Sequence, residues 1–160
     1  MRWRTLLILA LLILAGSGDL SASEPRIKKV LVQILDEKGR NAIHPSLFDR
    51  DAYQAYLRKH PKEQSGLRFD VNWSSDRALA DRLVLRFELR GLRPLGAKSK
   101  HQDFKSLVLE EPVKRHGWFS TWSSIKLVGR PFEDFGEIVA WRASLWDGPN
   151  KVAEQRSFLW

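Results

Sequence analysis

Apolar and polar side chains alternate along most of this chain, and this alternation constrains the fold more than any other feature. In residues 82–90 every second side chain is apolar and most of those between them are charged. A period of two residues is that of a β-strand with one buried and one exposed face. The predicted strands are residues 28–36, 67–74, 82–90, 105–110, 117–128, 137–146 and 151–160.

The first two predicted strands each carry one apolar face. In the first strand this face holds Val30, Val32 and Ile34, and in the second it holds every other residue from Leu67 to Trp73. Turn-forming residues separate the strands, most clearly the Asp-Gly-Pro-Asn sequence at 147–150. We therefore predict an all-β protein, a seven-stranded antiparallel sandwich.

Residues 46–60 interrupt the β pattern. Their apolar side chains follow helical spacing, at Phe48, Ala52, Tyr53, Tyr56 and Leu57. Ser46 or Asp49 is a candidate N-cap, and Pro61 comes directly after the segment. We predict one short amphipathic helical insertion between the first two strands, which covers an open edge or an end of the sandwich.

The N-terminal residues 1–23 have the order of parts of a secretory signal peptide. Arg2 and Arg4 precede an apolar run at residues 6–15, and small residues follow at 21–23. We expect cleavage between Ser23 and Glu24, a single domain at 24–160, and a secreted or periplasmic protein. An uncleaved membrane anchor and a buried helix are the alternatives, although a membrane span needs about 20 apolar residues. No later segment is long and apolar enough for a transmembrane helix.

Composition narrows the possible chemistry. The chain has no cysteine, which excludes disulfides, thiol nucleophiles and thiolate metal sites. It carries a net charge of +8, which becomes +7 when two arginines and one aspartate leave with the signal peptide. A basic secreted protein favours anionic partners, although such a charge also serves solubility alone. No nucleic-acid-binding motif is present, and we expect no nucleic-acid partner.

No catalytic or metal-binding motif is recognisable. The four histidines, at 44, 60, 101 and 116, lack the short spacings of metal ligands. Acidic residues occur as adjacent pairs in turns, an arrangement that does not by itself place two carboxylates across a cleft. We therefore expect no enzyme activity, no cofactor and no metal.

Two groups of residues are candidates for binding. Trp118, Trp122 and Lys126 share one face of the predicted strand 117–128, where planar aromatic rings suit sugar rings or side chains of a partner. The alternative is that these tryptophans pack under the helix or a loop. The second group is a basic stretch that would contact an anionic surface or else remain solvated: Arg90, Arg93, Lys98, Lys100 and Lys105.

The closing hairpin leaves its register open. A four-residue turn would pair the apolar face of strand 137–146 with Arg156 and Glu154, which puts two charges on the core side. Either a β-bulge shifts the register, or this end of the hairpin is solvated on both faces.

Seven strands and a final hairpin, with apolar residues alternating from Val139 through Trp141 and Ala143 to Leu145, resemble immunoglobulin-like and fibronectin type III-like sandwiches of secreted proteins. The resemblance implies a fold, and it carries no catalytic motif. We expect a non-catalytic binding or structural module of the cell envelope that acts through protein–protein contacts, with an exposed sheet edge as the acceptor of a partner strand. The alternative is a carbohydrate-binding module, so the expected partner is an envelope protein or polysaccharide.

Overall fold

The computed structural model describes residues 24–92, 104–113 and 121–160, which form seven strands and a few short helices. The strands are β1 (Arg26–Asp36), β2 (Gln64–Ser74), β3 (Leu83–Leu92), β4 (Phe104–Pro112), β5 (Trp122–Val128), β6 (Glu137–Asp147) and β7 (Asn150–Arg156). The helices are α2 (Leu47–Lys59), the 3-10 turn η1 (Pro61–Glu63), α3 (Arg77–Ala80) and α4 (Arg130–Phe135).

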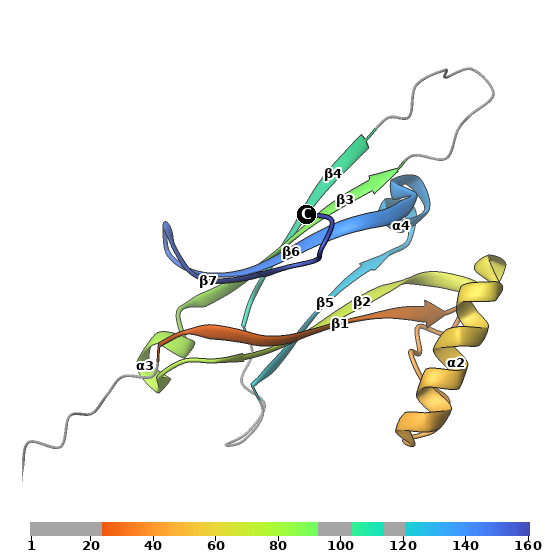
Figure 1. Cartoon of the computed structure of the whole chain (residues 1–160), viewed down its shortest axis with the longest axis horizontal. Helices are drawn as coiled ribbons and strands as arrows, with labels where there is room; N and C mark the ends of the chain where they lie inside the picture. The colour runs from red at the N-terminus through yellow and green to blue at the C-terminus, as the bar shows by residue number, and fades with distance from the viewer. Residues whose placement is uncertain (1–23, 93–103, 114–120) are drawn as a thin grey trace, which may run out of the picture.

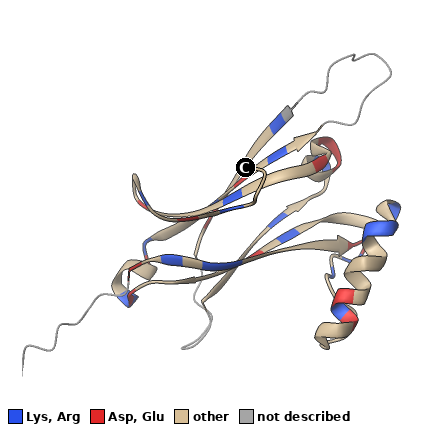
Figure 2. Ribbon diagram, viewed as in Figure 1, with Lys and Arg blue, Asp and Glu red and all other residues tan. Residues whose placement is uncertain are grey.

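The strands lie in two antiparallel sheets that face each other (Figure 1). Sheet A has the strand order β1-β2-β5, and sheet B has the order β4-β3-β6-β7. The predicted seven-stranded antiparallel architecture is confirmed at this level, as a mostly β, sandwich-like fold whose two sheets have three and four strands. Figure 2 shows that basic residues are spread over both sheets.

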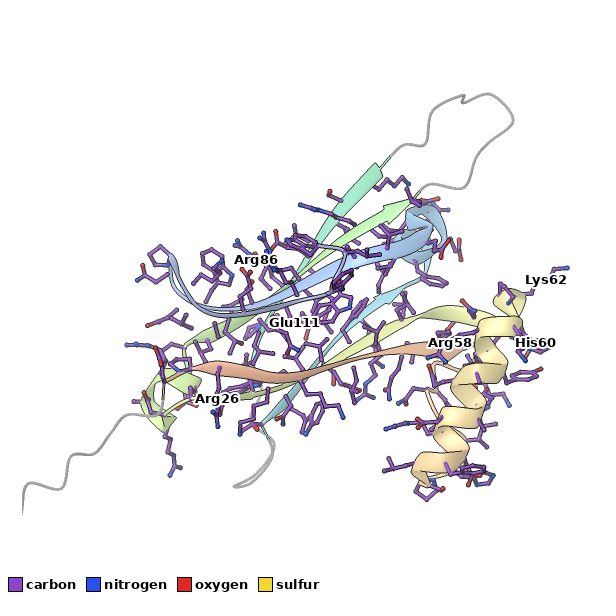
Figure 3. All side chains as sticks on the ribbon, viewed as in Figure 1. Arg26, Arg58, His60, Lys62, Arg86 and Glu111 are labelled. Atoms are coloured by element: carbon purple, nitrogen blue, oxygen red, sulfur yellow. The ribbon has the colours of Figure 1, made fainter. Side chains whose placement is uncertain are left out.

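The core lies between the sheets and is built from the alternating faces that the sequence predicted. Phe69 of β2 stacks on Phe87 of β3 with ring centroids 4.3 Å apart, and Trp141 of β6 stacks on Phe87 at 5.7 Å. The side chains of Phe69 and Phe87 are fully buried. Side chains from both sheets fill this space in Figure 3.

The register between β1 and β2 places the predicted apolar face of the first strand beside core residues of β2, although Gln33 and Leu35 of the other face are more deeply buried. Val30, Val32 and Ile34 pair with Val71, Phe69 and Leu67, and directly opposed residues of a β-ladder share a face. Val32 is nevertheless 37% exposed. Its exposure follows from the position of β1 at the edge of sheet A.

The helix forms where the sequence predicted it, but its predicted buried face is only partly correct, since Leu57 of that face is buried and Phe48 and Tyr56 are not. Ser46 is the N-cap and accepts a hydrogen bond from the N–H of Asp49. Phe48 is 81% exposed and Tyr56 is 42% exposed, whereas Gln54 and Leu57 are buried. The reason is that α2 contacts the end of β1 (Figure 1), so that only a narrow stripe of the helix is covered.

A β-bulge decides the register of the closing hairpin. Asp147 pairs with Asn150, which leaves a turn of two residues, and the register shifts between Leu145 and Trp146. After the shift Leu145 faces Ala153, so the charged Glu154 points away from the core. The first of the two alternatives is therefore correct. The strand also ends at Arg156, earlier than the predicted 151–160.

Candidate functional site

One side chain of α2 closes the free edge of β1. The Gln54 carboxamide nitrogen donates to the backbone carbonyl of Ile34 at 2.9 Å, and the Ile34 N–H donates to Gln54 Oε1 at 2.8 Å. The same nitrogen donates to the carbonyl of Asn41 at 2.8 Å. A neighbouring strand would bond to Ile34 in the same way, so this side chain terminates the sheet at that position.

Asp36 anchors α2 to the end of β1. Its Oδ1 accepts hydrogen bonds from the backbone N–H groups of Lys38 at 2.9 Å and Arg40 at 2.8 Å. Its Oδ2 accepts from Arg40 Nε at 2.9 Å and from the hydroxyl of Tyr53, on α2, at 2.8 Å. One carboxylate thus holds both the turn after β1 and the helix that covers the edge.

These contacts set the protonation of Asp36. Burial raises the pKa of its carboxyl, but the hydrogen bonds from the Arg40 backbone and guanidinium and from the Tyr53 hydroxyl outweigh burial and lower the pKa to about 2. Burial, together with the bond to this carboxylate, raises the pKa of Tyr53. Asp36 is therefore ionised over the whole physiological range.

The opposite edge of sheet A, β5, presents its backbone outward. The backbone groups of Ile34 point away from β2, and Ile34 pairs with Leu67. Ile34 and Leu67 therefore form a non-hydrogen-bonded pair, in which each residue turns its N–H and C=O away from the partner strand. The N–H and C=O of Leu67 consequently point to β5. Leu67 pairs with Leu127, so the N–H and C=O of its neighbour Lys126, and likewise of Ser124, point away from β2, to an edge where the described residues add no further strand to the sheet.

The nearest strand of sheet B at this side is β4. The N–H of Val113 donates to the carbonyl of Leu83 at 3.0 Å, so by the same alternation Glu110 and Pro112 turn their backbones away from β3. Pro112 has no N–H to offer at this edge, a position where proline is tolerated. Between β4 and β5 lies a groove of about 230 Å³, lined by Arg68, Leu85, Glu111, Pro112, Ser123, Ser124, Ile125 and Lys126.

The outer face of sheet A beside the groove is polar and ordered by side-chain contacts. Arg68 Nε bonds to Asp70 Oδ1 at 2.8 Å, and Arg68 Nη2 bonds to Ser124 Oγ at 3.1 Å. The Ser124 hydroxyl in turn donates to Asp70. Lys126 is exposed on the same face. This cluster fixes the conformation of β2 and β5 next to the groove.

The structure locates part of the predicted aromatic site. Trp122 and Lys126 share the outer face of β5, as predicted, because Ile125 and Leu127 between and beyond them are each 2% exposed and face the core. Trp122 is half-buried. Trp118 lies outside the described residues.

The predicted basic stretch is described only at its two ends. Arg90 pairs with Ser106, and Gly91 pairs with Lys105, so Arg90 and Lys105 lie on opposite faces of sheet B. The Lys105 ammonium donates to the carbonyl of Asp134 at the end of α4. These two residues therefore do not form one surface. The other members of the stretch lie outside the described residues: Arg93, Lys98 and Lys100.

A cluster that the sequence did not reveal covers the outer face of sheet B. The Arg90 guanidinium carbon lies 4.0 Å from the ring centroid of Trp160, and that of Arg142 lies 4.7 Å from the same ring. Arg142 donates to both carboxylate oxygens of Glu88, at 2.6 and 2.7 Å. Hydrogen bonding to Arg142 lowers the pKa of Glu88. In the sequence, only the alternation of charged residues along β3 indicates this cluster. The position of Trp160 over Arg90 cannot be predicted, because no local sequence pattern encodes it.

A second pair extends this face. The Arg86 guanidinium carbon lies 4.3 Å from the ring centroid of Trp146, and Arg86 also forms an ion pair with Glu110 of β4. Figure 3 labels Arg86 on sheet B, at a distance from the basic end of α2. Guanidinium groups over indole rings are held in place by both packing and electrostatics.

The remaining expectations concern metals and membranes. Within residues 24–92, 104–113 and 121–160, no group of three or more histidine or acidic side chains is close enough to hold a metal ion. His60 lies at the end of α2 (Figure 3). Its ring stacks on that of Tyr56 with centroids 3.9 Å apart, and His44 is exposed. In the same part of the chain, no helix has the length and hydrophobicity to cross a membrane.

Comparison with known proteins adds no relative. No family model, no curated protein and no solved structure matches this chain.

Proposed function

We propose that this protein is a secreted or periplasmic, non-catalytic module of the cell envelope, related to immunoglobulin-like domains, that binds a partner protein along β5. The observation that carries the proposal is the contrast between the two edges of sheet A. At the β1 edge, the Gln54 side chain hydrogen-bonds to the N–H and C=O of Ile34. At the β5 edge, the backbone groups of Ser124 and Lys126 point outward beside a groove. An unprotected strand edge is a template for β-augmentation.

The groove favours an extended segment with an acidic residue. A strand added to β5 would bond to the backbone at Ser124 and Lys126 and place alternate side chains between the two sheets. Lys126 lines the groove and has no ion pair among the described residues. Its ammonium is therefore available to a carboxylate of the partner.

The test is photo-cross-linking in the source organism. A photo-reactive residue replaces Val128, which is 47% exposed at the end of β5, and a control probe replaces Phe48 on α2. We expect a discrete adduct with a partner protein from position 128 and none from position 48. The adduct is then measured again in chains that also carry a substitution at Lys126.

Two substitutions at Lys126 separate backbone from side-chain recognition. Lys126→Pro removes one outward N–H, which an edge strand tolerates; Lys126→Ala keeps that N–H. We expect the adduct to disappear with proline and to weaken but persist with alanine, which removes only the contact of the ammonium with a partner carboxylate. A folded Lys126→Pro chain that still forms the adduct refutes strand addition. If circular dichroism shows that this variant is unfolded, Ser124→Pro and its control Ser124→Ala replace the pair.

Carbohydrate binding is the alternative function, and one observation favours it. Trp122 lies half-buried on the outer face of β5 beside the exposed Lys126, and an aromatic ring on a β-surface suits a sugar ring. Under this alternative, Trp122→Ala abolishes binding to envelope polysaccharide while Lys126→Pro leaves it unchanged. The opposite pattern, with loss of the protein adduct in Lys126→Pro alone, supports strand addition.

A further inference from the structure

The chain after β7 forms a fixed turn on the outer face of sheet B. The Ser157 N–H donates to the Trp141 carbonyl at 2.9 Å, and the Trp141 N–H donates to Ser157 Oγ at 3.0 Å. The Trp160 N–H then donates to the Ser157 carbonyl at 3.2 Å. Three hydrogen bonds therefore hold the residues between Ser157 and Trp160 at the tip of a turn.

This tip is apolar and exposed to solvent. Phe158 is 100% exposed and Leu159 is 68% exposed. Isolated apolar side chains on a surface are common, but two adjacent ones at the tip of a hydrogen-bonded turn form a compact apolar projection. Trp160 beside them lies over Arg90 and Arg142, with one ring contacted by two guanidinium groups.

The charges around the tip are positive and partly uncompensated. Glu88 pairs with Arg142, but neither Arg90 nor Arg156 has an ion pair among the described residues. Arg156 pairs in the ladder with Arg142 and therefore shares its face. We name Arg90, Arg156, Phe158, Leu159 and Trp160 the tail patch.

We propose that the tail patch docks on the surface of an anionic phospholipid membrane, with Phe158 and Leu159 entering the boundary between headgroups and acyl chains and Arg90 and Arg156 contacting the headgroup phosphates. Apolar side chains next to arginine and tryptophan are the composition of interfacial membrane contacts. An acidic polysaccharide would match the arginines, but it offers no apolar phase for Phe158 and Leu159. This site lies on sheet B and is independent of the strand-addition site on β5.

The expected binding is weak and depends on lipid charge. Only two apolar side chains enter the membrane, and each exposed arginine near an anionic surface adds a similar, modest contribution. Removal of both arginines should therefore weaken binding to anionic vesicles about tenfold or more. High salt should weaken binding as well, because exposed charges are screened over about 10 Å at 0.1 M ionic strength.

The test is flotation of the exported protein with vesicles of phosphatidylcholine alone or mixed with phosphatidylglycerol. All variants carry the same N-terminus, determined by mass spectrometry, so any contribution of residues 6–15 cancels between them. The patch variants are Phe158→Ser with Leu159→Ser, and Arg90→Gln with Arg156→Gln. The matched controls are Phe48→Ser, at an exposed phenylalanine on α2, and Lys28→Gln with Lys29→Gln, at two exposed cations of β1.

We expect the wild-type protein to bind the mixed vesicles and not the neutral ones, and we expect both patch variants to lose about tenfold in affinity while both controls keep it. Equal losses in patch and control variants overturn the proposal, because binding would then follow net charge or general hydrophobicity. Binding to neutral vesicles at the same level also overturns it. A third outcome also overturns the proposal. If the protein binds no vesicles but is retained on an acidic polysaccharide, and Phe158→Ser does not change this retention, the arginines bind a glycan instead.

Discussion

The Gln54 carboxamide occupies both backbone hydrogen-bonding groups of Ile34, at 2.8 and 2.9 Å, and does so from a helix rather than from a strand. A buried glutamine on a helix normally needs a partner for each of its polar atoms. Here the partners are the unpaired groups of an edge strand, which also need one. The two requirements satisfy each other, and β1 is thereby closed to other chains at Ile34.

Substitution of Gln54 should destabilise the protein and open this edge. Gln54→Leu leaves the N–H and C=O of Ile34 without partners, and we expect a loss of about 2–4 kcal/mol in the free energy of unfolding. We also expect concentration-dependent self-association through β1. Urea denaturation and sedimentation velocity measure the two effects. Lys59→Gln, at an exposed position of α2, is the control, and an unchanged stability of Gln54→Leu would contradict the edge-closing role.

Stability should fall in acid because of Asp36. Its pKa in the folded protein, about 2, is lower than the value of about 3.9 in unfolded chains, so its contribution is present above pH 4 and is lost as the pH falls toward 2. We expect Asp36→Asn to be less stable by about 1–2 kcal/mol at pH 7, and this difference should shrink toward zero near pH 2.

Urea titrations of both proteins between pH 7 and pH 2 measure this dependence. Asp51→Asn serves as the control, because the Asp51 side chain is 70% exposed and its ion pair with Arg50 should contribute little. A wild-type and Asp36→Asn difference that stays constant with pH would show that the carboxylate charge is not what holds the turn.

Gly66 should tolerate no side chain, because β5 passes directly beside it. A Cβ at this position would lie 2.5 Å from the carbonyl oxygen of Leu127 and 2.6 Å from Val128 Cγ1. We expect Gly66→Ala to lower the free energy of unfolding by about 1–3 kcal/mol through overpacking. Thermal unfolding measures the change.

Gly148 is the comparison for Gly66. It has a φ of +56° and open space around it, so Gly148→Ala tests backbone conformation alone. We expect that variant to lose about 1 kcal/mol. If Gly66→Ala is as stable as the wild type, β5 moves freely relative to β2 and the described edge is not rigid.

Gln155 offers a stabilising substitution. It pairs with Ala143, which is fully buried, and its Oε1 is buried without a hydrogen-bond partner among the described residues. Gln155→Leu removes this unsatisfied oxygen, and we expect a gain of up to about 1 kcal/mol. Gln155→Glu places a charge there and should be destabilising. Denaturation of both variants decides the matter, and a large loss in Gln155→Leu would show that the amide has a partner in solution.

Much of this fold can be predicted from local sequence patterns. The alternation at Leu85 and Phe87 placed both side chains in the core, and the pairing of Val30 with Val71 agrees with the faces read from each strand separately. The position of Ser46 before the helix likewise predicted its role as N-cap. Each of these features depends on neighbours within a few residues along the chain.

The sequence by itself determined the number of strands, the inward faces of β2 and β3 and the position of the helix, because periodicity and capping are local properties. Tertiary structure decided which face of α2 is buried. Gln54 is buried because it hydrogen-bonds to the backbone at the edge of β1, and not because its side chain is hydrophobic. It also decided the bulge before Ala153 and the placement of Trp160 over Arg90. These depend on contacts between residues far apart along the chain, which no local period encodes.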